Sequence, residues 1–170
     1  MIIKVDRNYL EINSIKELIY SKKPSENCDL EFIDPPDFHL NKFFYKQIGK
    51  DHRWIDRLTW NDQSWIAYVE DSKVKTYILK EQDNLIGYFE QIFHYEKKSC
   101  EIAYFGILKE HYGKKYGGFL LTEAIKKSFK NKIEKVWVHT CSLDHKYALK
   151  NYQARGMKIF KSETVNFNIN

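Results

Sequence analysis

The sequence predicts an α/β protein of the α+β type, in which a mostly antiparallel central sheet is flanked by helices. Residues 74–108 carry the alternating apolar pattern of strands, interrupted by turn residues at 83–84 and 97–99, which is typical of an antiparallel meander. From residue 101 onwards the pattern alternates between strand and helix. The 170 residues, 43% of them hydrophobic, are enough for one core, so we expect residues 1–170 to form a single domain.

The N-terminal part of the chain is predicted to be mainly helical. Candidate capping residues, Asn13 or Ser14 for a first helix and Asn61 for a third, precede apolar residues at helical spacing. A short apolar strand at 30–33 is separated from the second helix by two adjacent prolines. The three predicted helices cover residues 14–20, 37–48 and 61–69.

The second half is predicted to contain five strands and two helices. β-Branched and aromatic residues alternate with polar ones in three consecutive segments after residue 73. Gly117-Gly118 then open an amphipathic helix, and Gly156 is well suited to end a shorter one. The predicted strands cover residues 74–79, 85–94, 101–108, 135–140 and 157–167, and the short helix covers 147–154.

The positive charge of the chain is concentrated in one segment. Residues 109–132 hold seven lysines and two glutamates, which accounts for the whole formal net charge of +5. A local basic patch suits an anionic ligand, although a solvated helix face would have the same composition. Only four of the 28 basic residues are arginines, which argues against sequence-specific recognition of nucleic acid.

The composition also predicts a cytoplasmic protein. No apolar run approaches the roughly 18 residues of a membrane span, and the N-terminus lacks the pattern of a signal peptide. Cys28, Cys100 and Cys141 are odd in number and show no CxxC spacing, so free thiols in a reducing compartment are expected. His139 and Cys141 share one face of a predicted strand, but no further ligands at metal spacing accompany them, so no metal site is expected.

The most informative segment is 101–118, where a strand leads through a short basic loop into a helix. The backbone N–H groups of the first helical turn have no intrahelical partners, and the helix dipole favours an anion there. Glycines let a ligand approach the backbone, and Lys114 and Lys115 add charge at the same place. The segment suits a pyrophosphate, but its spacing is neither that of a P-loop nor that of a dinucleotide-binding fingerprint.

Residues 101–118 resemble motif A of the GNAT N-acetyltransferase superfamily. The usual form of this motif is Arg/Gln-x-x-Gly-x-Gly/Ala after a strand that often begins with Glu. In this chain Tyr112 stands at the Arg/Gln position, Lys115 at the first Gly and Gly117 at the second. The first two positions depart from the general pattern.

A downstream segment, residues 139–157, resembles motif B of the same superfamily, Asn-x-x-Ala-x-x-x-Tyr-x-x-x-Gly-Phe. His145 replaces the Asn and Met157 replaces the Phe. The positions that keep the motif are Ala148, Tyr152 and Gly156. The chain is also similar to a bacterial subgroup of the superfamily with an EIAYFG-type strand and an HTCxLDH-type strand end, and the superfamily match covers about residues 73–165.

The resemblance implies a GNAT-like fold, in which two parallel strands splay apart and hold acetyl-CoA in the gap between them. Backbone groups of Phe105, Gly106 and Ile107 would bind the pantetheine arm and the acetyl carbonyl. His145 would line the cofactor groove. The residues expected to wrap the pyrophosphate are Tyr112, Gly113, Lys114, Lys115, Tyr116, Gly117 and Gly118.

The resemblance also implies an acetyl-CoA-dependent N-acetyltransferase that acts directly on a primary amine of a small molecule or a peptide. Glu101 lies eleven residues before Tyr112, as the general base does in the histone-acetyltransferase branch. Glu90 is a rival base, because cross-strand pairing would place both carboxylates beside one cleft. Tyr152 matches the motif B tyrosine that protonates the CoA sulfur, and a tyrosine carries its proton at pH 7.

The acceptor site is expected to involve the N-terminal helices, which are rich in aromatic and cationic groups. The candidate substrate-binding residues are Arg53, Trp54, Tyr88, Tyr104 and His139. A core helix with arginines on its wet side would have the same composition. Two other functions stay open: a non-catalytic acyl-CoA-binding module, for which the departures from motif A argue, and a basic nucleic-acid-binding domain. We favour the enzyme, as a monomer or a homodimer without a nucleic-acid or membrane partner.

Overall fold

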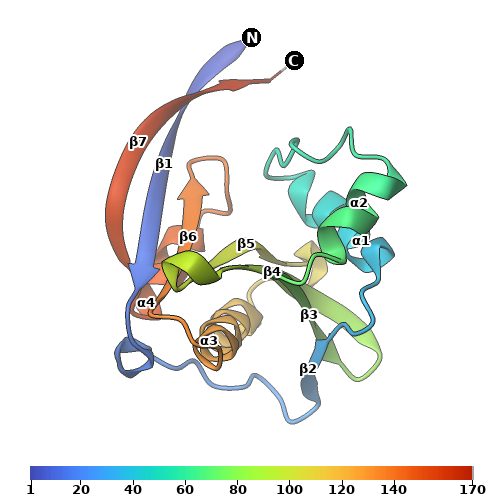
Figure 1. The fold of residues 1–170 in the computed structure, drawn as a ribbon, viewed down its shortest axis with the longest axis vertical. Coiled ribbons are helices and arrows are strands. Elements are labelled where there is room, and N and C mark those ends of the chain that lie inside the picture. Colours follow the sequence, from blue (N-terminus) through green and yellow to red (C-terminus); the bar gives the residue numbers. More distant parts are fainter. Residues whose placement is uncertain (170) are drawn as a thin grey trace.

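A computed structural model describes residues 1–169 and shows one sheet with helices on both sides (Figure 1). The strands are β1 (Ile2–Ile12), β2 (Cys28–Phe32), β3 (Val74–Glu81), β4 (Asn84–His94), β5 (Ser99–Ile107), β6 (Lys135–Cys141) and β7 (Lys158–Asn168). The helices are α1 (Phe38–Gly49), α2 (Asp62–Val69), α3 (Tyr116–Phe129) and α4 (Ala148–Ala154), with 3₁₀ turns at Ile15–Glu17, Tyr95–Lys97 and Lys109–His111.

The sheet has the order β2-β3-β4-β5-β6-β1-β7, and each pair of neighbours is antiparallel except β5 and β6. These two parallel strands pair at only three positions, from Ser99 opposite Lys135 to Glu101 opposite Trp137. Beyond Glu101, strand β5 keeps its partner β4 but has no strand partner on the β6 side within the described chain. The predicted mixed, mostly antiparallel sheet with splayed strands and flanking helices is therefore confirmed.

The chain begins with a strand and not with the predicted helices, which is a correction to the sequence-based order of elements. Strand β1 lies between β6 and β7 and pairs with both (Figure 1). Its buried residues change from odd to even positions between Val5 and Leu10, where the register against β7 shifts. Because the alternation changes phase along the segment, the sequence does not show one continuous alternating strand here.

The first predicted helix, residues 14–20, is also wrong in extent. Only Ile15–Glu17 forms a single 3₁₀ turn, and the Ser14 hydroxyl accepts the N–H of Lys16. The second and third predicted helices are confirmed as α1 and α2. Asp37 caps α1 through the N–H of His39, and Asn61 caps α2.

Strand β4 divides its side chains between two cores. Phe89 and Phe93 are fully buried in the core that contains the apolar face of α3. Tyr88 faces the other way, where its ring stacks on Phe44 of α1 with centroids 4.9 Å apart. As a result, α1 and α3 cover opposite faces of the sheet beside β5 (Figure 1).

Strand β5 carries a bulge close to the point where it leaves β6. Glu90 of β4 pairs with Tyr104, but Gln91 pairs with Ile102, so Ala103 is an extra residue. Ile102 packs in the α3 core, whereas Tyr104 packs in the α1 core after the bulge. A bulge bends and twists its strand, which accounts for the divergence of β5 from β6 at this place.

Gly87 of β4 lies so close to the end of β5 that no side chain fits at this position. A Cβ there would lie 2.5 Å from the Gly106 carbonyl oxygen and 2.7 Å from Ile107 Cδ1. We expect Gly87→Ala to lower the free energy of unfolding by about 1–3 kcal/mol, because a backbone atom has to move. Denaturant unfolding would measure this, with Gly117→Ala as the control, since its Cβ would meet only Asn151 Nδ2 at 3.6 Å. A similar loss in both variants would contradict the steric argument.

Candidate active site

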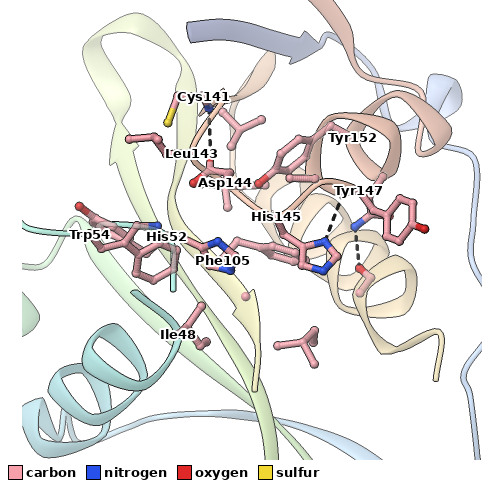
Figure 2. Close-up of a pocket in the computed structure, with 18 of the residues that line it drawn as sticks. Ile48, His52, Trp54, Phe105, Cys141, Leu143, Asp144, His145, Tyr147 and Tyr152 are labelled. Atoms are coloured by element: carbon pink, nitrogen blue, oxygen red, sulfur yellow. Dashed lines mark hydrogen bonds between the residues drawn. The ribbon is translucent and has the colours of Figure 1, made fainter. Parts of the chain in front are cut away.

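A pocket of about 510 Å³ opens where β5 and β6 part (Figure 2). Its walls come from the end of β5, the end of β6, the first turn of α3, helix α4 and the loop between α1 and α2, with one residue each from β1 and β7. Figure 2 shows Trp54 and His52 on one side, and His145, Tyr147 and Tyr152 on the other. The split in the sheet therefore brings together segments that are far apart in the sequence.

Most of the residues predicted from the sequence line this pocket. From the expected cofactor side they are Phe105, Gly106, Ile107, Tyr112, Gly113, Lys115, Tyr116, Gly117, Gly118 and His145. From the expected acceptor side and the catalytic set they are Arg53, Trp54, Tyr104, His139 and Tyr152. The predicted residues that do not line the pocket are Glu90, Glu101, Tyr88 and Lys114.

The basic loop before α3 has a backbone that can wrap an anion. Gly113 and Lys115 both have positive φ, of 77° and 66°. Lys115 is followed directly by the first residue of α3, and no side chain caps the helix. The N–H groups of the first turn are therefore open to a ligand. The left-handed backbone at Lys115 favours Gly at this position, since a residue with a Cβ costs about 1–2 kcal/mol in this conformation.

Contacts behind the loop hold the start of α3 in place. Asn151 of α4 donates its side-chain N–H to the Gly117 carbonyl at 3.1 Å. The Tyr116 hydroxyl donates to the Glu81 carboxylate at the end of β3. A Cβ at Gly118 would lie 2.3 Å from Arg155 Nη1, so the chain packs closely on this side. The free N–H groups at the start of α3 thus have a rigid support.

Tyr152 projects from α4 into the pocket beside Asp144. Figure 2 shows its hydroxyl directed toward that carboxylate. Burial raises the pKa of Tyr152, and the negative charge of Asp144 raises it further, so the phenol stays protonated at neutral pH. Asp144 is itself held by the Thr140 hydroxyl at 2.6 Å and the Cys141 N–H at 3.0 Å. The site therefore contains a phenol that keeps its proton at neutral pH.

The two carboxylates expected to act as base lie outside the pocket. Glu101 contacts the His94 ring, with Oε2 3.1 Å from Nε2. Glu90 is fully buried, and its Oε1 lies 2.8 Å from Arg57 Nη1 and accepts the Tyr68 hydroxyl at the same distance. Its second oxygen accepts an amide N–H of Asn41. These contacts leave Glu90 in the interior, under the loop that joins α1 to α2.

Arg57 anchors that loop to the sheet. Besides its ion pair with Glu90, its backbone N–H donates to the Tyr45 hydroxyl at 3.0 Å. Its guanidinium also lies 4.3 Å from the ring centroid of Tyr104. Trp54 in the same loop packs against Tyr104, with ring centroids 4.7 Å apart. One buried ion pair thus positions two aromatic residues of the pocket wall.

Tyr88, expected as a substrate contact, is fully buried behind this wall against Phe44. Its hydroxyl has no hydrogen-bond partner in the described part of the chain. Lys114, expected at the pyrophosphate, is an exposed residue next to the pocket-lining Gly113 and Lys115. The position of Lys114 is compatible with an ionic contact to a ligand that leaves the pocket at this loop.

A contact across the pocket mouth joins the α1–α2 loop to the loop before α3. His52 Nε2 lies 3.3 Å from the Tyr112 hydroxyl. The Tyr112 ring packs edge-on against His145, with centroids 4.8 Å apart. Tyr112 therefore connects both sides of the pocket, a role that its spacing in the sequence did not indicate.

Several pocket residues were missed by the sequence analysis: Arg7, Asp56, Asp144 and Asn151. Asp144 belongs to the HTCxLDH-type segment, which was the one available signal. Arg7 and Asp56 are ordinary charged residues in segments without a motif. Only the pairing of β1 with β6 and the anchoring of the α1–α2 loop bring them to the pocket.

The family assignment follows from sequence comparison together with this site. A model of the acetyltransferase (GNAT) family matches residues 38–157. The chain belongs to the GNAT family. The matched region of this GNAT protein contains the split in the sheet, the loop before α3 and Tyr152. No curated protein matches the chain.

Solved structures share the fold of this GNAT protein at low sequence identity. GCN5-related N-acetyltransferases from Sphaerobacter thermophilus and Kribbella flavida are 14% and 12% identical, with TM-scores of 0.72 and 0.67. The alignments cover 95% and 97% of this chain but 50% and 58% of theirs, so it spans little more than half the length of these relatives.

An aminoglycoside acetyltransferase from an uncultured soil metagenomic sample, in complex with trehalose, is 12% identical with a TM-score of 0.65. That alignment covers 78% of this GNAT protein and 90% of the other chain. At such identities the likeness establishes the fold. In residues 1–169 no helix is long and apolar enough to cross a membrane, and no cluster of three potential metal ligands occurs.

Proposed function

We propose that this GNAT protein transfers the acetyl group of acetyl-CoA to a primary amine of a small molecule or a peptide. The observation that carries the proposal is the pocket at the split between β5 and β6, which runs from the free N-terminus of α3 to the α1–α2 loop. One end offers an anion site for the cofactor, and the other offers aromatic and charged groups for an acceptor. GNAT proteins typically use acetyl-CoA, and these walls suit it.

The cofactor side binds through backbone groups. The pyrophosphate accepts hydrogen bonds from the first turn of α3 and from the loop around Gly113, with Lys114 and Lys115 adding positive charge. The edge of β5 after Glu101 has no strand partner within residues 1–169, so Phe105, Gly106 and Ile107 offer N–H and C=O groups to the pantetheine arm. We assign polarisation of the acetyl carbonyl to the Ile107 N–H, in the manner of an oxyanion donor.

Tyr152 is the proposed general acid. As the amine nitrogen bonds to the acetyl carbon, the carbon–sulfur bond breaks and the electron pair stays on the sulfur. The Tyr152 hydroxyl donates its proton to that sulfur, which releases CoA as the thiol. The protonated state needed for this step is favoured by burial and by Asp144, both of which raise the pKa of Tyr152.

The acceptor side is assigned to Arg53, Trp54, Tyr104 and His139. Trp54 and Tyr104 form an aromatic wall, which suits the carbon skeleton of an amine. Arg53 is exposed in the loop with a left-handed backbone, at φ 54°. Because one relative in fold is an aminoglycoside acetyltransferase, aminoglycosides belong in the acceptor panel together with amino acids, short peptides and polyamines.

The cofactor part of the proposal is tested by calorimetric titration with acetyl-CoA. We expect binding in the micromolar range, and at least about tenfold weaker binding for Lys114→Glu/Lys115→Glu, because two favourable charges near the pyrophosphate become unfavourable. Lys97→Glu/Lys98→Glu, with the same charge change at the other end of β5, is the matched control. Equal weakening in both variants, or no binding by the wild type, would contradict the assigned site.

Turnover separates the enzyme from the alternative, a non-catalytic acyl-CoA-binding module. Release of free CoA in the presence of the amine panel, together with an acetylated product by mass spectrometry, is the expected result. Binding of acetyl-CoA without turnover on any amine of the panel would favour the binding module.

A further inference from the structure

The proposed transfer leaves one proton without an assigned acceptor. When the amine attacks the acetyl carbon, its nitrogen becomes positively charged and must lose a proton. Glu90 is enclosed by Arg57, Tyr68 and Asn41, and Glu101 is paired with His94 outside the pocket lining. The acceptor of the proton therefore has to be sought among the groups that do line the pocket.

His139 lies at the required place. β5 and β6 last pair at Glu101 and Trp137, and His139 follows two residues later, on the same face of β6 as Trp137. Its side chain lines the pocket, and its ring packs against Tyr9 of β1 with centroids 5.6 Å apart. In the described part of the chain neither ring nitrogen has a hydrogen-bond partner, so a lone pair is available to a substrate.

The other ionisable groups of the pocket are less suitable. Asp144 Oδ2 already accepts hydrogen bonds from Thr140 and Cys141, so that oxygen is occupied. Asp56 is carried by the α1–α2 loop, whereas His139 is on strand β6 and packs against Tyr9. Burial raises the pKa of the Cys141 thiol, as does Asp144, so this thiol stays protonated at neutral pH.

Charged and titratable groups surround His139 from three strands and two loops. His139 is partly exposed to solvent in the pocket, but desolvation by the chain packed around it lowers its pKa from the usual 6.5. Arg7 lowers this pKa further, while three carboxylates raise it in part. The imidazole is therefore neutral at pH 7, the form that accepts a proton. The groups are Arg7 and Tyr9 from β1, Glu101 from β5, Cys141 from β6, Asp144 from the β6–α4 loop and Asp56 from the α1–α2 loop.

We propose that His139 is the general base of the acetyl transfer and takes the proton from the amine nitrogen as the carbon–nitrogen bond forms. The inference rests on the proposed function. The nitrogen of the attacked amine bears a positive charge and an electron-withdrawing carbonyl carbon, so it is much more acidic than a free ammonium. A neutral imidazole is basic enough to receive that proton. Tyr152 supplies a different proton to the sulfur, so the amide and the thiol both form as neutral products. After the products leave, the His139 imidazolium releases its proton to water and Tyr152 takes one from water, which restores both groups.

The direct test compares the wild type with His139→Gln at each pH from about 5 to about 9, using the amine of the panel with the highest turnover. The ratio of their kcat/KM values cancels the ionisation of the amine, which is common to both. At pH 8 we expect the kcat/KM of the wild type to be about 10–100 times that of His139→Gln. The effect is small for a general base, because water that enters the pocket can accept the proton in the variant. The ratio should fall toward one as the pH is lowered through the pKa of His139, because the protonated imidazole can no longer accept a proton.

The pH at which the wild-type kcat/KM falls on the acid side of the profile, its acid limb, should move in opposite directions in two variants with substitutions near His139. Glu101 raises the pKa of His139, so Glu101→Gln should shift the limb to lower pH. Arg7 lowers it, so Arg7→Gln should shift the limb to higher pH. A purely structural role for His139 would produce neither shift. His39→Gln, an exposed position on α1, is the matched control and should leave the profile unchanged.

The outcomes are distinguishable. Loss of the proposed function would appear as a wild type that binds acetyl-CoA but acetylates no amine, and it would remove the basis of this inference. A wild type that turns over, with a ratio near one at every pH, would overturn the role of His139 alone. Long-range ¹H–¹⁵N NMR measures the protonation state of the His139 ring directly and needs no turnover. A protonated ring at pH 7 would also exclude the role.

Discussion

Replacing Arg57 with methionine is expected to lower the free energy of unfolding by about 3–5 kcal/mol. Glu90 is completely buried, and Arg57 is its counter-charge at 2.8 Å with 6% of its own surface exposed. Removing the guanidinium leaves an unpaired carboxylate in a low-dielectric interior, which is far more costly than loss of a surface ion pair. Urea or guanidinium unfolding at pH 7 would measure the loss.

Two further variants make this test specific. Arg57→Met/Glu90→Gln removes the buried charge and keeps an oxygen acceptor for Tyr68, so it should regain more than half of the lost stability. Arg53→Met changes an exposed arginine of the same loop and should cost at most about 0.5 kcal/mol. No recovery in the double variant would show that packing of the arginine, and not its charge, stabilises the loop.

Replacing Tyr152 with phenylalanine is expected to lower kcat by about 100-fold or more. The substitution removes the hydroxyl that is proposed to protonate the CoA sulfur, and it keeps the ring that packs near Phe105 with centroids 6.2 Å apart. Because the ring remains, the dissociation constant for acetyl-CoA should change by less than about threefold. Steady-state kinetics and calorimetric titration measure the two effects separately.

The pH dependence adds a signature to the Tyr152 prediction. Burial and Asp144 raise the pKa of Tyr152, so the acid stays protonated as the pH rises. The wild type should therefore show no loss of kcat from this group up to about pH 9. Tyr95→Phe, an exposed tyrosine at the far end of β5, is the control. An unchanged kcat in Tyr152→Phe would remove the residue from the mechanism.

The cofactor side of the site was predictable from the sequence because its geometry is local. The loop before α3 and the first turn of that helix are adjacent in the chain, so their spacing alone places N–H groups and lysines together. Tyr152 is similar, since its position relative to His145 depends on one short turn and one helix. The structure adds that Lys115 adopts a left-handed backbone, a conformation that favours Gly.

The positions of the two expected bases were not predictable, because they depend on which face of a strand each residue occupies. Glu101 has the spacing of a general base, but the extra residue Ala103 shifts the faces of β5 between Glu101 and the end of the strand. Glu90 faces the interior, where its pairing with Arg57 joins segments that are far apart in the sequence. Neither fact leaves a local signal.

By itself, the sequence determined the fold class, the basic loop that leads into α3 and the candidate acid Tyr152, since each arises from periodicity or spacing within one segment. Only the tertiary structure decided that β1 completes the sheet and that Glu90 and Glu101 do not line the pocket, whereas His139 does. Those outcomes depend on long-range strand pairing, where a single extra residue turns a side chain from one face of the sheet to the other.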